Sequence, residues 1–308
     1  MKSVRKFPQH IIESQQFDPV LVHQLFSLAD RLQKKVPQSL EGKIMATLFY
    51  EPSTRTRFSF ESAMLKLGGN VISTENAREF SSAAKGESLE DTVRVVGSYA
   101  DVIILRHHEE GAAKRAAAVS EVPIINAGDG AGQHPTQALL DLYTIWRYNK
   151  KIEKSRVVFV GDLKYGRTVR SLAYLLGKYP GVTISFVSPP ELRVGNDIRA
   201  YLKRHRIEFS EPSSLEEAIA DADVVYMTRI QKERFKNQKE HKKLEGSYRL
   251  TREHADSMKK GAIIMHPLPR VNEISPDVDT SEKAAYFKQV RYGLFLRMAI
   301  LESILARK

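Results

Sequence analysis

The sequence contains no cysteine among its 308 residues. Disulfide bonds, thiolate metal sites and cysteine nucleophiles are therefore excluded. It also lacks any apolar run that approaches the length needed to cross a membrane. The first segment, MKSVRKFPQHIIESQQF, is basic but has no apolar core of the kind found in a secretory signal peptide. We therefore expect a cytoplasmic protein with no membrane partner.

Acidic residues are in deficit. There are 37 Asp and Glu against 48 Lys and Arg, which gives a formal net charge of +11 and a pI near 9.6. Such a balance fits nucleic acid, an anionic surface or small polyanionic substrates, and it does not choose among them. The length favours two domains, with enough apolar residues for a core in each.

Short strand-like runs alternate with helical patterns along the whole chain, and no internal repeat interrupts them. This alternation predicts an α/β fold of two domains, each a mostly parallel sheet flanked by helices, joined by interdomain helices. Ligands of such sheets bind outside the carboxyl ends of the strands. Strands are predicted near 43–50, 70–75, 101–107, 123–128, 156–161, 182–188, 223–228 and 262–265. Helices are predicted near 54–67, 88–100, 111–119, 135–149, 167–179, 195–205, 214–222 and 286–306, with capping boxes opening at Ser88 and Ser214.

The polar segment NKKIEKS, at the end of the helix predicted over 135–149, is the best candidate for a domain junction. We therefore predict one domain over 1–134, an interdomain helix over 135–149 and a second domain over 150–285.

The stretch EPSTRTRF, at 51–58, places positive charge at the start of a predicted helix. That end of a helix disfavours cations, so Arg55 and Arg57 call for an anion. Backbone N–H groups, the hydroxyls of Ser53, Thr54 and Thr56, and guanidinium groups together favour a phosphate site. The alternative is an N-cap serine with both arginines turned to solvent.

The stretch GDLKYGRT, at 161–168, is one residue away from a phosphate-binding P-loop, with Arg167 in place of the lysine. An arginine fork suits a planar carboxylate better than it replaces that lysine. No predicted strand ends in the acidic residue that would hold Mg²⁺. A nucleotide hydrolase is therefore the weaker interpretation, and no G-x-G-x-x-G follows a strand to favour a dinucleotide.

Two more arginines, Arg106 and Arg229, follow apolar strands directly. Together with Arg55 and Arg167 they suggest several anionic groups bound in one cleft. His134 precedes the proline that opens a helix, so it is either a plain capping residue or a neutral imidazole that donates to a carbonyl oxygen. Gln137, one turn later, could reach the same ligand.

The segment HPLPR, at 266–270, follows a predicted strand. Its two prolines remove backbone N–H groups, so the loop presents carbonyl oxygens that could accept from an amino group. Taken alone, the segment is more typical of a rigid turn.

These motifs stand in the order found in one enzyme family. STRTRFSFE, SSAAKGES, RHHEEGAA, NAGDGAGQHPTQALLDLYTI, GDLKYGRTVRSL, MTRIQKERF and HPLPRVNEI resemble the catalytic chains of aspartate carbamoyltransferases, over essentially the whole chain. The resemblance implies transfer of the carbamoyl group of carbamoyl phosphate to L-aspartate in pyrimidine biosynthesis. It makes 1–134, with helix 286–308 packed back on it, the carbamoyl-phosphate domain and 150–285 the aspartate domain.

The resemblance also implies residue roles. Ser53, Thr54, Arg55 and Thr56 cradle the phosphate with Arg106, and Thr56, Arg106 and His134 address the carbamoyl oxygen. Gln137 and the carbonyls of Pro267 and Leu268 bind the carbamoyl amide, and the Leu268–Pro269 bond is expected to be cis. Arg167, Thr168, Arg229 and Gln231 bind aspartate together with Lys85, and the loop bearing Ser81 and Lys85 completes a neighbouring subunit's site.

A shared site implies a homotrimer. Trimers of this family stand alone, join zinc-bearing regulatory chains or sit within larger assemblies, and all three remain open as partners. The implied reaction, direct attack by the amine without a covalent intermediate, needs no metal and no cofactor.

Three alternatives are left for comparison. An ornithine carbamoyltransferase would be expected to read HCLP where this chain reads HPLP, and Arg229 would repel ornithine's cationic side chain. A Mg²⁺-dependent nucleotide hydrolase would depend on Arg167. A nucleic-acid-binding module is disfavoured because the arginines end separate strands instead of forming one basic stripe.

Overall fold

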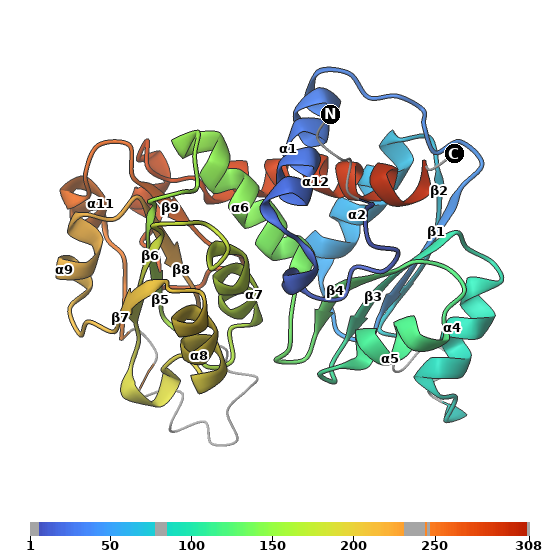
Figure 1. Ribbon diagram of the computed structural model, residues 1–308, viewed down its shortest axis with the longest axis horizontal. Coiled ribbons are helices and arrows are strands. Elements are labelled where there is room, and N and C mark those ends of the chain that lie inside the picture. The colour runs from blue at the N-terminus through green and yellow to red at the C-terminus, as the bar shows by residue number, and fades with distance from the viewer. Residues whose placement is uncertain (1–5, 78–84, 231–243, 245–246, 307–308) are drawn as a thin grey trace. The chain divides into compact units, whose positions relative to one another are not determined.

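A computed structural model describes residues 6–77, 85–230, 244 and 247–306 (Figure 1). The chain divides into two compact units. The first unit comprises Met1–Leu140 and Arg291–Lys308, and the second comprises Asp141–Val290. The second unit is thus inserted between two pieces of the first.

The first unit is built on a parallel sheet of strand order β2-β1-β3-β4. Helices α1 and α2 lie on one face of this sheet, and α4 and α5 lie on the other (Figure 1). The strands are β1 (Ile44–Phe49), β2 (Asn70–Glu75), β3 (Val102–His107) and β4 (Ile124–Asp129). The helices are α1 (Pro19–Lys34), α2 (Thr54–Lys66), α4 (Leu89–Gly97) and α5 (Ala112–Val119), with a 3₁₀ turn at Ser14–Gln16.

Helix α1 was not among the predicted elements, although its sequence carries clear signals. The Asp18 carboxylate accepts a hydrogen bond from the Leu21 N–H at 2.9 Å, and Pro19 opens the helix. Such an N-cap followed by proline is a typical helix start. Apolar residues at helical spacing then form its buried face: Leu21, Val22, Leu25, Phe26, Ala29 and Leu32.

The second unit has a parallel sheet of order β7-β6-β5-β8-β9. Helices α7 and α8 lie on one face, and α9 and α11 on the other (Figure 1). The strands are β5 (Arg156–Val160), β6 (Thr183–Val187), β7 (Glu208–Ser210), β8 (Val224–Met227) and β9 (Ile263–Met265). The helices are α7 (Arg167–Leu176), α8 (Asn196–Arg204), α9 (Leu215–Ala220) and α11 (Arg252–Ser257), with 3₁₀ turns at Pro190–Leu192 and Pro276–Thr280.

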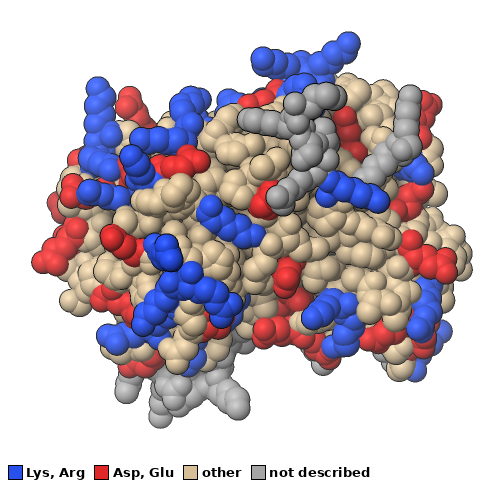
Figure 2. Space-filling model, in the orientation of Figure 1, with Lys and Arg blue, Asp and Glu red and all other residues tan. Residues whose placement is uncertain are grey.

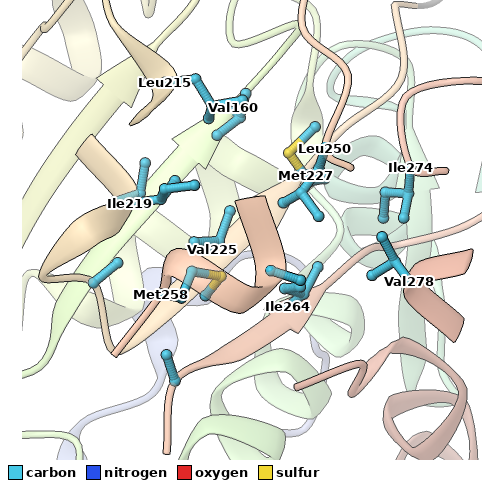
Figure 3. Packing of buried hydrophobic residues seen from close by; sticks show 14 of the residues in the cluster. Val160, Leu215, Ile219, Val225, Met227, Leu250, Met258, Ile264, Ile274 and Val278 are labelled. Carbon is cyan, nitrogen blue, oxygen red and sulfur yellow. The ribbon is translucent and has the colours of Figure 1, made fainter. Parts of the chain in front are cut away.

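One hydrophobic core of the second unit lies between the sheet and helices α9 and α11. Figure 3 shows Val225 and Met227 of β8 packed with Ile219 of α9 and Met258, which follows α11. β8 lies between two other strands and helices cover both faces of the sheet (Figure 1), so all four of its residues are buried. A continuous apolar run is what a central parallel strand requires.

Two helices cross the division between the units, α6 (Pro135–Asn149) and α12 (Tyr286–Leu305). The end of α12 belongs to the first unit, where Arg297 Nη1 donates to Ser59 Oγ at 2.8 Å. The same guanidinium lies 5.1 Å from the ring centre of Phe60. Residues near the carboxyl end of the chain therefore hold helix α2.

These observations confirm the predicted fold class, two units of parallel sheet flanked by helices. The serine half of both predicted capping boxes is present, since Ser88 Oγ accepts from Asp91 N–H and Ser214 Oγ accepts from Glu217 N–H, each at 3.1 Å. Within the described parts of the chain, no helix is long and apolar enough to span a membrane.

Candidate active site

The carboxyl ends of β1, β3 and β4 form one edge of the first sheet. Phe49 of β1 is in register with Arg106 of β3, and His107 of β3 is in register with Asp129 of β4. Because the strands are parallel, the segments that follow them leave the sheet at the same edge. The predicted phosphate residues, Arg106 and the segment before His134 are therefore brought together.

Ser53 takes the N-cap position of α2, and the helix begins at Thr54, as predicted. At this described turn, the Ser53 hydroxyl makes no capping hydrogen bond to the helix. Arg55 is exposed on the first turn and Thr56 is buried. The first turn thus carries hydroxyl groups, guanidinium groups and backbone N–H groups, and it contains no acidic residue.

Arg106 is fixed on its strand by two interactions. Its Nη1 donates to the Ala127 carbonyl at 3.2 Å, and its Nη2 lies 3.6 Å from the Glu51 carboxylate. Its side chain is largely buried. Because both partners lie at the same edge, the guanidinium is held in place rather than extended into solvent.

His134 directly precedes α6, and its carbonyl accepts from the Ala138 N–H at 3.1 Å. The loop before it is held by Asp129, whose carboxylate accepts from the N–H groups of Gly111 and Gln133, each at 2.9 Å. Asn126 donates to the same carboxylate at 3.1 Å. These bonds fix the position from which the helix starts, so both His134 and Gln137 are buried at defined places.

The carboxyl ends of β5, β8 and β9 form the corresponding edge of the second sheet. Val160 of β5 is in register with Met227 of β8, and Tyr226 with Met265 of β9. Arg167 is the first residue of α7, Thr168 the second, and Arg229 follows β8 by two residues. This edge therefore brings the two predicted carboxylate-binding arginines and the 266–270 loop together.

Gly161 allows the segments after β5 and β8 to touch. Its φ is +110°, and a Cβ there would lie 2.3 Å from the Thr228 carbonyl oxygen, a severe clash. The neighbouring Asp162 carboxylate accepts from the Tyr165 N–H at 2.9 Å, so it shapes this turn. β2 ends in an acidic residue, Glu75, and β4 ends in Asp129. That carboxylate serves the loop contacts described above.

The 266–270 loop is built around His266, which is 1 % exposed. The expected cis Leu268–Pro269 bond is present, and Leu268 has a φ of +51°. The Leu268 N–H donates to His266 Nδ1 at 2.7 Å, so this nitrogen carries no proton. His266 Nε2 therefore carries the proton and donates to Glu273 Oε1 at 2.7 Å.

Burial lowers the pKa of His266, against the opposing effect of the Glu273 carboxylate, so the ring is neutral at neutral pH. Burial alone would raise the pKa of Glu273, but hydrogen bonds from His266 and from backbone N–H groups bring it below its usual value. In the first unit, burial and the neighbouring His108 lower the pKa of His107 to about 4.

The remaining predicted residues are one exposed lysine and two residues outside the described chain. Lys85 is exposed on the connection from β2 to α4. Ser81 and Gln231 lie outside the described residues. Across the described parts of the chain, no three His, Asp or Glu residues are grouped so that they could hold a metal ion.

Comparisons with known proteins agree with this two-part arrangement. Residues 9–147 match the model of the carbamoyl-P binding domain of aspartate/ornithine carbamoyltransferases, and residues 153–304 match that of the Asp/Orn binding domain. The chain belongs to the aspartate/ornithine carbamoyltransferase family.

Individual members of the family are similar over nearly the full chain. Aspartate carbamoyltransferase 3, chloroplastic, from Pisum sativum is 54% identical over 301 residues, which cover 96% of this chain and 77% of the pea protein. The structure of the catalytic subunit of Methanocaldococcus jannaschii aspartate transcarbamoylase has 51% identity and a TM-score of 0.89, covering 97% of this chain and 98% of that one. A structure of aspartate transcarbamoylase from Trypanosoma cruzi, in complex with carbamoyl phosphate and aspartate, has 39% identity and a TM-score of 0.91. The match covers 96% of this chain and 97% of that one.

Within this carbamoyltransferase chain, the residues that support the loops were not predicted from the sequence. Asn126, Asp129, His266 and Glu273 were not singled out, and neither was Glu51 beside Arg106. A signal was present for one of them, since His266 follows an apolar strand just as Arg106 ends one. The partner of His266 could not be identified, because the contact depends on the turn between positions 266 and 273.

Proposed function

We propose that this chain transfers the carbamoyl group of carbamoyl phosphate to the amine of L-aspartate, giving N-carbamoyl-L-aspartate and phosphate, in pyrimidine biosynthesis. The main support for this proposal is that cationic and hydroxyl groups lie at the carboxyl edge of each sheet. The relatives named above are aspartate carbamoyltransferases, and one is a complex with both substrates.

For the first unit, we assign carbamoyl phosphate to residues 1–134 together with helix 286–308. The first turn of α2, Ser53 to Thr56, is suited to the phosphate because N–H groups and a guanidinium converge there. Arg106 binds both the phosphate and, with Thr56 and His134, the carbamoyl oxygen. Gln137 binds the carbamoyl amide.

For the second unit, we assign aspartate to residues 150–285. Arg167 and Arg229 each suit a carboxylate, because a guanidinium can donate two parallel hydrogen bonds to it. Thr168 and Gln231 complete this set. The carbonyls of Pro267 and Leu268, in the rigid loop that ends with Pro269, accept hydrogen bonds from the carbamoyl NH₂.

The reaction proceeds by attack of the neutral aspartate amine on the carbamoyl carbon, without a covalent intermediate. A C–N bond forms, the carbonyl oxygen becomes an oxyanion, and the C–O bond to phosphate then breaks. Phosphate leaves with the bonding pair and can accept the proton lost by the amine. Thr56, Arg106 and His134 stabilise the oxyanion, and the remaining groups orient the substrates.

A steady-state assay of carbamoyl-amino-acid formation, with L-aspartate and L-ornithine in parallel and no added metal, tests this function. Saturable turnover with aspartate alone is expected. Turnover only with ornithine would contradict the role of Arg229. An absence of turnover with either substrate, from a well-folded protein, would return attention to residues 161–168 and nucleotide binding.

The charge distribution bears on the nucleic-acid alternative. On the face shown in Figure 2, acidic groups are interspersed among the basic ones. A protein that follows a phosphate backbone typically gathers Lys and Arg into one patch or stripe. The expected control result is weak binding to duplex DNA with only a shallow dependence on salt concentration, because few phosphates would be contacted.

We also propose a homotrimer in which the loop bearing Ser81 and Lys85 completes a neighbouring chain's site. An apolar surface on the first unit supports contact with another copy, because Phe58 and Leu65 are exposed seven residues apart on α2. Zinc-bearing regulatory chains are a further candidate partner. A cytoplasmic location also remains a prediction, and the pea relative is named as chloroplastic.

Mixing two inactive variants tests the shared site. Lys85→Ala and Arg55→Ala chains should each be inactive alone, and mixed trimers should regain activity because some sites then contain neither substitution. Subunit exchange is confirmed by native mass spectrometry. Exchange without any recovery would contradict a shared site.

A further inference from the structure

The carbonyls of Pro267 and Leu268 can bind an amide only if the loop holds them in a fixed direction. Proline supplies no N–H to tie the backbone at positions 267 and 269. The loop follows β9, which ends at Met265, and it is only partly buried. Some other group must therefore hold it.

His266 and Glu273 hold both ends of this loop. His266 Nδ1 accepts from the Leu268 N–H at 2.7 Å, within the loop. Glu273 Oε2 accepts from the N–H groups of Val271 and Asn272, each at 3.1 Å, where the loop ends. The 2.7 Å bond between the two side chains joins these tethers into one unit.

This pair is itself anchored in the interior of the second unit. The His266 N–H donates to Gln289 Oε1 at 3.1 Å, and Gln289 Nε2 donates to Asp141 at 2.6 Å. Asp141 also accepts from the Tyr226 hydroxyl at 2.7 Å. All of these side chains are buried, so the network exchanges no bonds with solvent and is rigid.

We propose that His266 and Glu273 are positioning residues, which orient the Pro267 and Leu268 carbonyls so that the site prefers a carbamoyl group over isosteric acyl groups. The proposal rests on the proposed function. The preference is assigned to an imidazole that accepts a hydrogen bond from the Leu268 N–H on one nitrogen and donates a hydrogen bond to Glu273 from the other. Neither side chain touches the substrate.

Acetyl phosphate provides the discriminating probe, because it replaces the carbamoyl NH₂ by a methyl group of similar size. A hydrogen bond to each loop carbonyl is available to carbamoyl phosphate alone. We expect the wild-type protein to bind carbamoyl phosphate about 10-fold or more tightly than acetyl phosphate. Inorganic phosphate, which has no acyl group, serves as the reference for the phosphate subsite.

Two substitutions at one position separate the two bonds of His266. In His266→Gln the longer amide can still reach Glu273, but the acceptor for the Leu268 N–H is lost. In His266→Asn the shorter side chain keeps an oxygen near the Nδ1 position and loses Glu273. Glu273→Gln removes the charged acceptor, and Tyr226→Phe is the matched control, because it breaks the same buried network at a site that does not contact the loop.

Affinities for the three phosphates are measured by calorimetry on folded variants, together with steady-state kinetics. His266→Gln and Glu273→Gln should lose most of the preference for carbamoyl over acetyl phosphate, with the affinity for inorganic phosphate unchanged. His266→Asn should keep a larger share of the preference than His266→Gln, and Tyr226→Phe should keep it fully.

The possible results discriminate between the two proposals. If the variants lower the affinity for all three phosphates equally, or leave the preference for carbamoyl phosphate intact, the pair has a purely structural role. Either result would overturn this proposal. If the wild-type protein neither turns over carbamoyl phosphate nor prefers it to acetyl phosphate, the proposed function fails, and this inference fails with it.

Discussion

His107 in the first unit and His266 in the second stand at the carboxyl ends of strands and make the same local contact. In each, Nδ1 accepts from the N–H two residues ahead, Glu109 at 3.0 Å and Leu268 at 2.7 Å. They differ in what surrounds the rest of the ring. His107 packs against the rings of Tyr50 and His108, at 4.7 and 4.3 Å between ring centres, whereas His266 donates to the Glu273 carboxylate.

The difference shows how one local device serves two purposes. Beside aromatic rings, the imidazole ends a strand and starts a turn. With a carboxylate on its other nitrogen, it is also linked to a second stretch of backbone, five and six residues later, whose N–H groups bind that carboxylate. The arrangement in the second unit therefore defines a whole loop, while that in the first defines a single turn.

The largest contrast between the two units should appear in catalysis. Arg55→Ala should lower kcat/KM by about 10²–10³-fold, because it removes a charged donor from the phosphate. Arg229→Ala should instead raise KM for aspartate by about 10–100-fold, since it removes a hydrogen-bonded cation from a carboxylate. Steady-state kinetics with each substrate varied separates them. Equal loss of aspartate affinity in both variants, with phosphate binding intact in Arg55→Ala, would contradict the assignment of substrates to units.

Acid should reveal the next difference. The pKa of His107 is near 6.5 in the unfolded chain but about 4 in the folded protein. The unfolded state therefore binds more protons in this range, and the free energy of unfolding decreases as pH falls from 6.5 to 4. Over this pH range, His107 accounts for a decrease of ~2–3 kcal/mol in the free energy of unfolding. Denaturant titrations across this range should show a shallower decrease for His107→Gln, and an unchanged slope would show that other groups dominate.

The third contrast concerns two glutamates, of which one binds backbone N–H groups in the interior and the other is exposed. Glu273→Gln should lower the free energy of unfolding by ~2 kcal/mol, because the buried carboxylate accepts from two backbone N–H groups and from His266. Glu109→Gln, its counterpart beside His107, should change it by less than ~0.5 kcal/mol, since Glu109 is an exposed partner of Arg115. Urea midpoints measure both. Similar values would mean that burial of Glu273 matters little.

Helix capping should give effects that are alike in the two units. Ser88 caps α4 in the first and Ser214 caps α9 in the second, each with a 3.1 Å bond. Substitution of either by alanine should lower the free energy of unfolding by ~1 kcal/mol. Thermal denaturation followed by circular dichroism provides the measurement. A loss at only one serine would indicate that its helix is held by packing instead.

The elements that could be predicted from the sequence are those with a long or strongly patterned signal. The strand that contains Arg106 and the strand that precedes Arg229 are apolar runs, and parallel pairing then places both arginines at carboxyl edges. β7 and α11 were missed because three and six residues are too few to establish a period, and neither carries the second signal that marked elements of equal length. For α9 that signal was the Ser214 capping box, and for β9 it was a continuous apolar run. α1 was missed despite its cap at Asp18 and a regular apolar face, so the signal was available.

The candidate site divides in the same way. Arg55, Arg167 and His134 were identified because helix starts and strand ends can be located along the chain. Asp129 and Glu273 were not, because their partners are backbone N–H groups that meet them only after the loops have closed. A carboxylate that accepts from backbone N–H groups leaves no trace in the spacing of residue types.

The insertion of the second unit into the first sets an order on synthesis. A ribosome produces residues 141–290 in full before it produces any of residues 291–306. Until then, Arg297 is absent, and Ser59 and Phe60 of α2 lack their partner. The nascent chain can thus complete the second unit while the first is still unfinished, and the later part of α12 then completes the unit that was begun first.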